Sequence, residues 1–172
     1  MSDMKRIIIC CLLFLLCFSI SACTPEISNT PNTKIEVTSE NDFKIEGTNI
    51  DIGSSYKNII EEMKEPNQKD YFEAGEYLDY GDITFFTDSE DEKIAKVSAI
   101  ALHGERKIGS VKVGMLPSEV KQILGDPKFE GESNDREILG WNINYVIGNK
   151  EVSFISDTSD SVITTIFVKA RL

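Results

Sequence analysis

Cysteine is missing from this chain beyond residue 23: its four cysteines are Cys10, Cys11, Cys17 and Cys23. The rest of the sequence therefore cannot form a disulfide, present a thiolate nucleophile or build a cysteine-based zinc or iron–sulfur site. We expect a domain that its hydrophobic core stabilises without covalent or metal cross-links.

Histidine is equally scarce, because His103 is the single one in 172 residues. A Ser-His-Asp triad could form only around it, and zinc sites with several histidines are excluded. His103 opens a polar stretch, 103–107, in which we expect a solvated loop residue. Carboxylates are abundant, but no pair stands out as the acid and nucleophile of a hydrolase. We predict no catalytic residue and no cofactor, with a carboxylate-based envelope hydrolase as the weakest alternative.

The N-terminal segment, 1–23, is organised like an export signal. Lys5 and Arg6 precede an unbroken apolar run, 7–18, which is shorter than the about 20 residues of a membrane-spanning helix. Ile20-Ser21-Ala22-Cys23 follows and resembles the lipobox of bacterial lipoproteins. That resemblance implies cleavage between Ala22 and Cys23 and a diacylglycerol on the Cys23 sulfur. A plain secreted protein cut near Ala22 and an uncleaved anchor helix are the alternatives.

Basic residues are outnumbered, since the formal net charge is −11. Nucleic acids bind proteins largely through Lys and Arg, so we exclude them as partners. Residues 24–41 are rich in Thr, Ser, Asn and Pro and too poor in apolar side chains to offset the entropy of ordering. We therefore divide the chain into a signal peptide (1–22), the lipidated Cys23 with a flexible tether (23–41) and a single domain (42–172).

An internal repeat marks that domain. The segment 50–66 aligns without a gap on 111–127. Both segments contain alternating Ile or Val, a turn glycine, apolar residues at helical spacing and a final Pro. Ser55 is placed to cap the first helix, and Pro117 to begin the second. Gly125 suits a left-handed helix end, whereas the first copy has a lysine at that position.

Three strand-like runs follow each helix signal: 76–80, 83–86 and 96–102 in the first copy, and 140–147, 151–155 and 162–169 in the second. We predict an α+β fold made of two tandem helix-plus-three-strand repeats, about 50–102 and about 111–169. They would form one antiparallel sheet with the helices on one face.

The second copy carries a motif, Val113-Gly114-Met115, then Glu119-Val120, then Ile123-Leu124-Gly125-Asp126-Pro127. It resembles the signature of small exported proteins with the beta-lactamase-inhibitor-like fold, which BamE-like lipoproteins of outer-membrane assembly share. The tandem form behind a lipobox is similar to the YjgB-type family of Gram-positive lipoproteins. The resemblance implies the fold above and, since the inhibitor grips another protein with its exposed sheet face, a protein-binding role. It fixes no contact residues, and Leu116 stands where a capping Thr is usual.

Two acidic stretches, 88–92 and 157–161, fall at equivalent turns of the two copies. Clustered carboxylates are what calcium needs, and Asp88, Asp91, Asp157 and Asp160 are weak metal candidates. The first stretch lacks the glycine and final glutamate of an EF-hand loop. We therefore favour polar hairpin turns held by Asp and Ser side chains.

The run 141–147 alternates, which places Trp141, Ile143, Tyr145 and Ile147 on one face. We expect that face to be core. If it is the uncovered face instead, Trp141 and Tyr145 become anchors for a partner, because large aromatic residues often carry binding energy at interfaces.

The sequence thus predicts a lipoprotein held on the extracytoplasmic face of the cell membrane by acylated Cys23 in the lipid bilayer. We expect a non-enzymatic module that binds another exported protein or an envelope component. A calcium or small-ligand sensor is the alternative.

Overall fold

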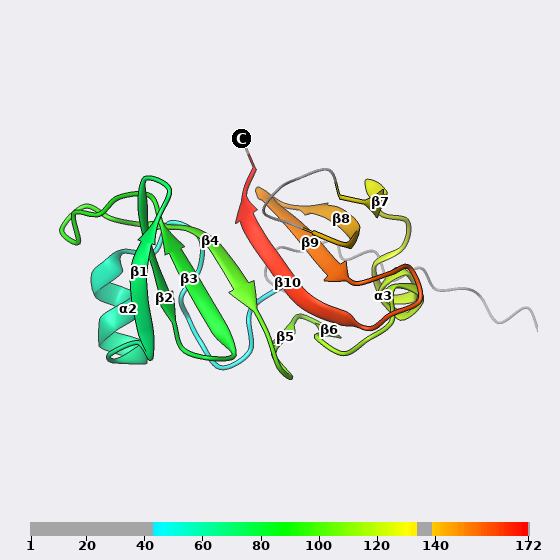
Figure 1. Cartoon of the computed structure of the whole chain (residues 1–172), viewed down its shortest axis with the longest axis horizontal. Helices are drawn as coiled ribbons and strands as arrows, with labels where there is room; N and C mark the ends of the chain where they lie inside the picture. The colour runs from blue at the N-terminus through cyan, green and yellow to red at the C-terminus, as the bar shows by residue number, and fades with distance from the viewer. Residues whose placement is uncertain (1–42, 134–138, 172) are drawn as a thin grey trace, which may run out of the picture. The chain divides into compact units, whose positions relative to one another are not determined.

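Eight antiparallel strands form one sheet in the order β1-β2-β3-β4-β10-β9-β8-β7 (Figure 1). The computed structural model describes residues 43–133 and 139–171, all within a unit that spans Thr33–Leu172. The predicted signal peptide, its cleavage site at Ala22, the lipidation site Cys23 and the tether 23–41 lie outside the described residues.

The elements follow one another in a simple order. The first part contains α2 (Tyr56–Met63), β1 (Gln68–Phe72), β2 (Gly75–Asp79), β3 (Ile83–Thr87) and β4 (Val97–Leu102). A separate two-stranded sheet follows, made of β5 (Lys107–Ile108) and β6 (Val111–Lys112). The last part contains α3 (Pro117–Leu124), β7 (Phe129–Glu132), β8 (Trp141–Ile147), β9 (Lys150–Ser156) and β10 (Ile163–Ala170).

The predicted fold class is wrong. The protein is not built from two tandem helix-plus-three-strand repeats: it is mostly β, with an eight-stranded sheet, a two-stranded sheet and two short helices in its described part. The prediction missed β1 and β7, the two edges of the large sheet. All five residues of β1 are exposed, so no apolar alternation marks it as a strand. Its conformation is set by pairing with β2 across a two-residue turn.

Both helices begin and end where local chemistry requires it. Ser55 caps α2, and its side chain accepts a hydrogen bond from the Asn58 amide. Pro117 occupies the first turn of α3, where its missing N–H costs nothing. Each helix ends at a residue with positive φ, Lys64 (69°) and Gly125 (78°).

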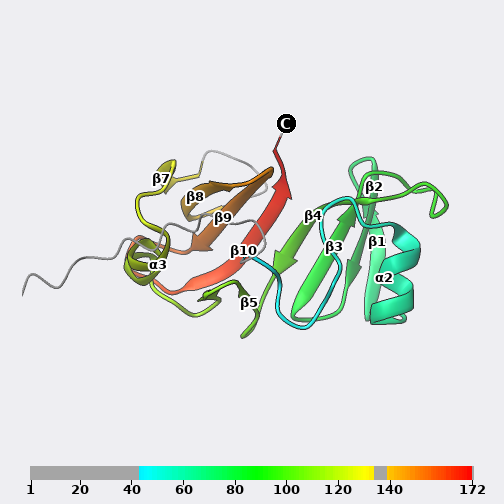
Figure 2. The same cartoon turned by 180° about the vertical axis from the view of Figure 1, so that it is seen from behind.

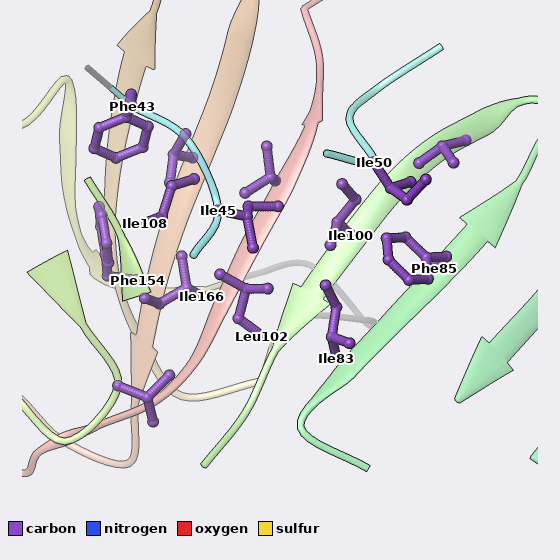
Figure 3. Close-up of a cluster of buried hydrophobic side chains, with 14 of the residues drawn as sticks. Phe43, Ile45, Ile50, Ile83, Phe85, Ile100, Leu102, Ile108, Phe154 and Ile166 are labelled. Atoms are coloured by element: carbon purple, nitrogen blue, oxygen red, sulfur yellow. The ribbon is translucent and has the colours of Figure 1, made fainter. Parts of the chain in front are cut away.

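The core lies on one face of the large sheet (Figure 3). Segment 43–50 contributes Phe43, Ile45 and Ile50, and the helices contribute Ile59 and Val120, all of them buried. This segment crosses behind β3 and β4 in Figure 1 and in front of them in Figure 2, so the two views show opposite faces of the sheet. Within residues 43–133 and 139–171, neither helix has the length and apolarity needed to span a membrane.

Candidate functional site

Four aromatic side chains gather on the face of the sheet opposite the core. They are Phe72 on β1, Tyr77 on β2, Phe86 on β3 and Phe167 on β10, and we call them the aromatic cluster. Ring centroids lie 5.0 Å apart for Phe72–Phe86, 6.5 Å for Tyr77–Phe86 and 5.9 Å for Phe86–Phe167. The contacts of Phe86 with Phe72 and Phe167 are edge contacts, which stabilise aromatic groups beyond simple burial. The cluster therefore forms an apolar strip that runs across β1, β2 and β3 and reaches past β4 to β10.

Strand alternation explains why these rings point away from the core. On β2, β3 and β10 the neighbours Leu78, Phe85 and Ile166 are fully buried, so the next residue along each strand must face the other way. Phe72 is 37% exposed, and Tyr77, Phe86 and Phe167 are partly exposed. No described helix covers this face, which is the one turned toward the viewer in Figure 1.

Acidic side chains flank Tyr77 on this face. Asp70 is its direct partner on β1, and Asp79 lies two residues along β2, so all three point the same way. One oxygen of Asp70 accepts the Tyr71 amide at 2.8 Å, and one oxygen of Asp79 accepts the Gly81 amide at 2.9 Å. The Tyr77 hydroxyl accepts a hydrogen bond from Gln68 Nε2 at 2.7 Å, which holds the ring in place.

The same face over β7, β8 and β9 has a different character. Asn144 Nδ2 donates to Ser153 Oγ at 3.0 Å. Glu151 lies between two lysines, 3.6 Å from Lys128 and 3.8 Å from Lys169. The charged groups in this region pair with one another, whereas the buried Asn142 Oδ1 on β8 has no hydrogen-bond partner in the described part of the chain.

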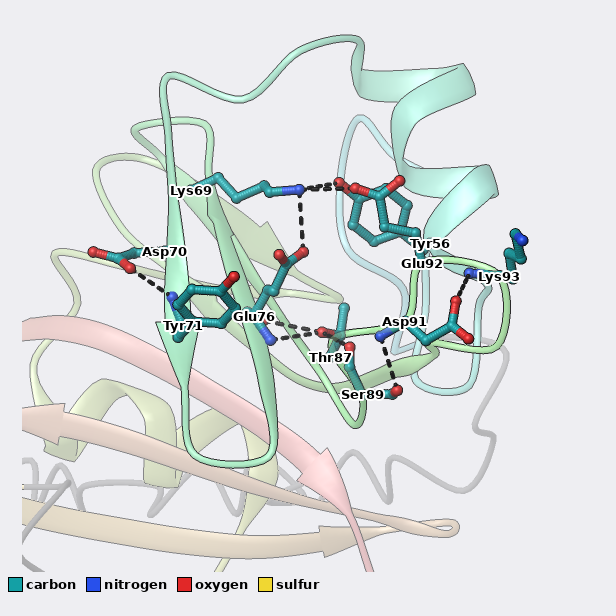
Figure 4. A network of polar contacts seen from close by, with 10 residues as sticks. All are labelled: Tyr56, Lys69, Asp70, Tyr71, Glu76, Thr87, Ser89, Asp91, Glu92 and Lys93. Carbon is teal, nitrogen blue, oxygen red and sulfur yellow. Dashed lines mark hydrogen bonds and ion pairs between the residues drawn. The ribbon is translucent and has the colours of Figure 1, made fainter.

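A polar network lies on the core side, beside a groove between α2 and the loop 88–96. The groove encloses about 560 Å³, and its lining includes Tyr56, Ile60, Glu61 and Glu92. Lys69 Nζ lies 3.0 Å from the Tyr56 hydroxyl and 2.9 Å from Glu92 Oε1 (Figure 4).

The charges of that network are those of a structural ion pair. Hydrogen bonds to Glu92 and Tyr56 raise the pKa of Lys69 well above its usual range, and the bond from Lys69 lowers the pKa of Glu92. Burial raises the pKa of Tyr56. General acid–base chemistry near neutral pH requires the reverse, a carboxyl with raised pKa or a lysine with lowered pKa. The network fastens β1 to the loop and to α2.

Trp141 and Tyr145 both lie on the core face of β8. Tyr145 is 6% exposed, its ring meets Phe154 edge-on at 5.8 Å, and its hydroxyl donates to the Gly125 carbonyl at 2.8 Å. Trp141 is partly buried and packs against the core. The structure thus gives Tyr145 a role in packing, and its use as a partner anchor stays a prediction that would require its hydrogen bond to the Gly125 carbonyl to break.

Two of the four acidic turn residues accept hydrogen bonds from nearby backbone amides. Asp88 accepts the Lys96 amide at 2.8 Å and Asp91 accepts the Lys93 amide at 3.1 Å, whereas Asp157 and Asp160 are exposed. In the described ranges, no three His, Cys, Asp or Glu side chains come together as a metal site would require. Metal binding by these residues stays a prediction.

His103 sits just beyond β4 and is half-buried. Its Nδ1 lies 3.4 Å from Thr165 Oγ1 on β10, and its amide donates to the Asp82 carbonyl at 2.8 Å. It therefore helps to join two strands from distant parts of the chain.

Sequence reasoning missed the aromatic cluster, although a signal for part of it exists. Tyr77 and Phe86 each neighbour a strand residue that belongs to the core, so alternation alone places both on the opposite face. Phe167 joins them only through the pairing of β4 with β10, which the sequence does not reveal. Phe72 lies on the missed strand β1.

The fold and the open face define a mostly β domain with an apolar strip on an antiparallel sheet. The chain belongs to the family described as "Domain of unknown function (DUF4309)", whose model matches residues 35–168. No curated protein matches the chain.

One similar solved structure is the crystal structure of an extracellular protein containing an SCP domain from Bacillus anthracis str. Ames. The two chains are 12% identical, with a TM-score of 0.53. The match covers 69% of this chain and 44% of that chain, so it shows a shared fold over less than half of the neighbour.

Proposed function

We propose that this protein is a lipoprotein of the extracytoplasmic membrane face whose DUF4309 domain binds another exported protein without catalysing a reaction. The single observation that carries the binding role is the aromatic cluster. Monomeric domains rarely leave a contiguous apolar strip uncovered without a use, and large aromatic residues dominate binding energy at interfaces. Phe86 contacts each of the other three rings on the open sheet face, which fits that pattern.

Two further observations support export. The N-terminal charge pattern, apolar run and lipobox-like Ile20-Ser21-Ala22-Cys23 are those of a lipoprotein precursor and are similar to the YjgB-type lipoproteins. The structural neighbour is described as an extracellular protein. Two or more acyl chains at Cys23 would anchor the domain stably, since each buried CH₂ contributes about 0.8 kcal/mol.

Metabolic labelling tests the anchor. Cells that express the full chain are grown with an alkyne analogue of palmitate, and the labelled protein is recovered from the membrane fraction. The Cys23→Ala variant should lose the label and remain as an uncleaved precursor, whereas Cys17→Ala should keep the label. Equal labelling of the wild type and Cys23→Ala would contradict lipidation at this residue.

Photo-crosslinking in intact cells tests the binding face. A p-benzoylphenylalanine placed at position 86 or 167 should capture one discrete exported protein, because both positions lie within the aromatic cluster. The matched control is position 57 on α2, where the Lys57 side chain is 78% exposed but lies on the other side of the sheet. Identical adduct patterns at all three positions, or no protein adduct at 86 and 167, would contradict binding at this face.

A further inference from the structure

The charge distribution beside Tyr77, at the β1–β2 end of the aromatic cluster, is one-sided. At the other end, Lys169 on β10 lies two residues from Phe167 on the same face and pairs with Glu151 at 3.8 Å. Strands β1 to β4 contain one basic residue, Lys69. Lys69 alternates with Asp70 and points to the core side, where it meets Tyr56 and Glu92. Consequently no cation of these four strands lies on the open face, while Asp70 and Asp79 both do.

Each of these two carboxylates retains an oxygen without a partner in the described part of the chain. Asp70 uses Oδ1 for the Tyr71 amide, and Asp79 uses Oδ1 for the Gly81 amide and the Thr84 hydroxyl at 3.1 Å. Neither aspartate takes part in an ion pair with any residue of 43–133 or 139–171. The remaining oxygens are therefore available to an external donor.

Tyr77 completes the arrangement. Asp70 is its cross-strand partner and Asp79 lies two residues along β2. The Tyr77 side chain is fixed by Gln68 on one side and by contact with Phe86 on the other. An aromatic face attracts cations, and carboxylates at its edge strengthen that attraction. Neutral or acidic side chains would leave both carboxylates unpaired when the face is covered, which costs free energy.

We propose that the partner of the open face inserts a cationic side chain, arginine or lysine, over Tyr77 and between Asp70 and Asp79, with apolar neighbours resting on Phe86. This inference rests on the proposed protein-binding function and names the chemistry of the segment recognised. The strong negative charge of the whole chain, −11, would speed the approach of such a segment.

Fluorine NMR of the full chain in nanodiscs, labelled with 3-fluorotyrosine, tests the proposal directly. The Tyr77 resonance is assigned from the Tyr77→Phe variant. The probes are four peptides: acetyl-Leu-Arg-Leu-amide, the same peptide with lysine, the neutral isostere with citrulline in place of arginine, and the acidic peptide with glutamate. We expect the arginine peptide to shift the Tyr77 signal at a concentration at least about tenfold lower than the citrulline peptide needs.

Two double variants that each remove two negative charges provide the control. Asp70→Asn with Asp79→Asn should make the arginine and citrulline peptides equivalent, whereas Asp157→Asn with Asp160→Asn, at an exposed turn, should leave the preference unchanged. Equal shifts from the arginine and citrulline peptides on the wild-type chain would overturn the cation proposal. The protein-binding function would survive that result if photo-crosslinking at position 86 still captured its partner.

An absence of any Tyr77 shift at millimolar peptide would also overturn the cation proposal. Loss of both the peptide shift and the photo-crosslink would overturn the binding function as well. A lysine peptide that matches the arginine peptide would identify a point charge as the recognised feature, and a weaker lysine peptide would identify a stacked guanidinium. Both results support the proposal.

Discussion

The two halves of the large sheet share a framework but differ in the face that they leave open. We take α2 with β1–β4 as the first half and α3 with β7–β10 as the second. In the first half, Gly75 at the start of β2 lies close to the carbonyl of Thr87 at the end of β3. In the second half, Gly140 just before β8 lies close to the carbonyl of Ser156 at the end of β9. In each half, a tyrosine hydroxyl donates at 2.8 Å to the carbonyl that ends the helix.

The difference lies in the side chains that point away from the core. The first half carries most of the aromatic cluster and two carboxylates outside any ion pair of the described chain, whereas the second half carries an amide–hydroxyl pair and a carboxylate held between two lysines. Similar backbones thus support unlike surfaces. Function follows the side chains of the open face rather than the fold, and the first half is the one that combines apolar rings with unpaired carboxylates.

The largest expected effect breaks the shared framework. A Cβ at position 75 would lie 2.0 Å from the Thr87 carbonyl oxygen, so Gly75→Ala must displace β2 from β3. We expect the free energy of unfolding to fall by about 3 kcal/mol, measured by urea denaturation of the full chain in detergent. Gly140→Ala should cost at least as much, because Gly140 also has φ of +107° and its Cβ would lie 2.5 Å from the Ser156 oxygen.

Gly53→Ala provides the control for these two variants. Gly53 has φ of +83° but nothing within 4 Å of an added Cβ, so only backbone strain remains, about 1 kcal/mol. If Gly75→Ala were no more harmful than Gly53→Ala, the close approach of β2 to β3 would be refuted.

A smaller effect tests the tyrosine ties. Tyr80→Phe and Tyr145→Phe each remove a hydroxyl–carbonyl hydrogen bond, so each should destabilise its half by about 1 kcal/mol. Burial raises the pKa of Tyr80 to about 12 and that of Tyr145 above its usual range. The stabilisation that the two protonated hydroxyls contribute is fully present below about pH 10, the pKa of tyrosine in the unfolded chain. It is lost as the pH rises from there through the higher pKa of each tyrosine in the folded protein.

Urea midpoints measured from about pH 8 to pH 12 check this dependence. The wild type should lose stability above about pH 10, and the double phenylalanine variant should lose less over the same range. Tyr71→Phe is the matched control, because Tyr71 is 68% exposed and should not change the profile. An identical alkaline profile for wild type and double variant would show that these two tyrosine hydroxyls do not control it.

The sequence predicts the central strands of this fold well and its edges poorly. Six strand-like runs lie within one residue of β2, β3, β4, β8, β9 and β10, because a strand packed on a core leaves alternation in the sequence. The edge strands β1 and β7 leave none, since they are shaped by partners rather than by burial. The error in the fold class follows from that gap.

The candidate site was predictable only in part, for a related reason. Alternation could place Tyr77 and Phe86 opposite the core, but their union with Phe72 and Phe167 depends on pairings between strands that are far apart in the chain. Trp141 stands out in the sequence as the single tryptophan, although the structure places it on the core side. Alternation along 141–147 predicts that side correctly, whereas a role of Trp141 as a partner anchor stays a prediction.

The smallest effect sharpens the comparison between the two helix ends. Lys64 has φ 69° and ψ −154°, and Gly125 has φ 78° and ψ −157°, a region of backbone conformation that strongly favours glycine. Lys64→Gly should therefore raise the free energy of unfolding by about 0.5–1 kcal/mol, less than the full strain because glycine also gains entropy in the unfolded chain. Lys64→Ala separates strain from side-chain loss, because it keeps the strain and removes the bond from Lys64 Nζ to the Glu61 carbonyl. If Lys64→Gly instead lowered stability as much as Lys64→Ala, the contacts of the lysine side chain would contribute more free energy than the backbone strain costs. Lysine would then be no worse than glycine at this helix end.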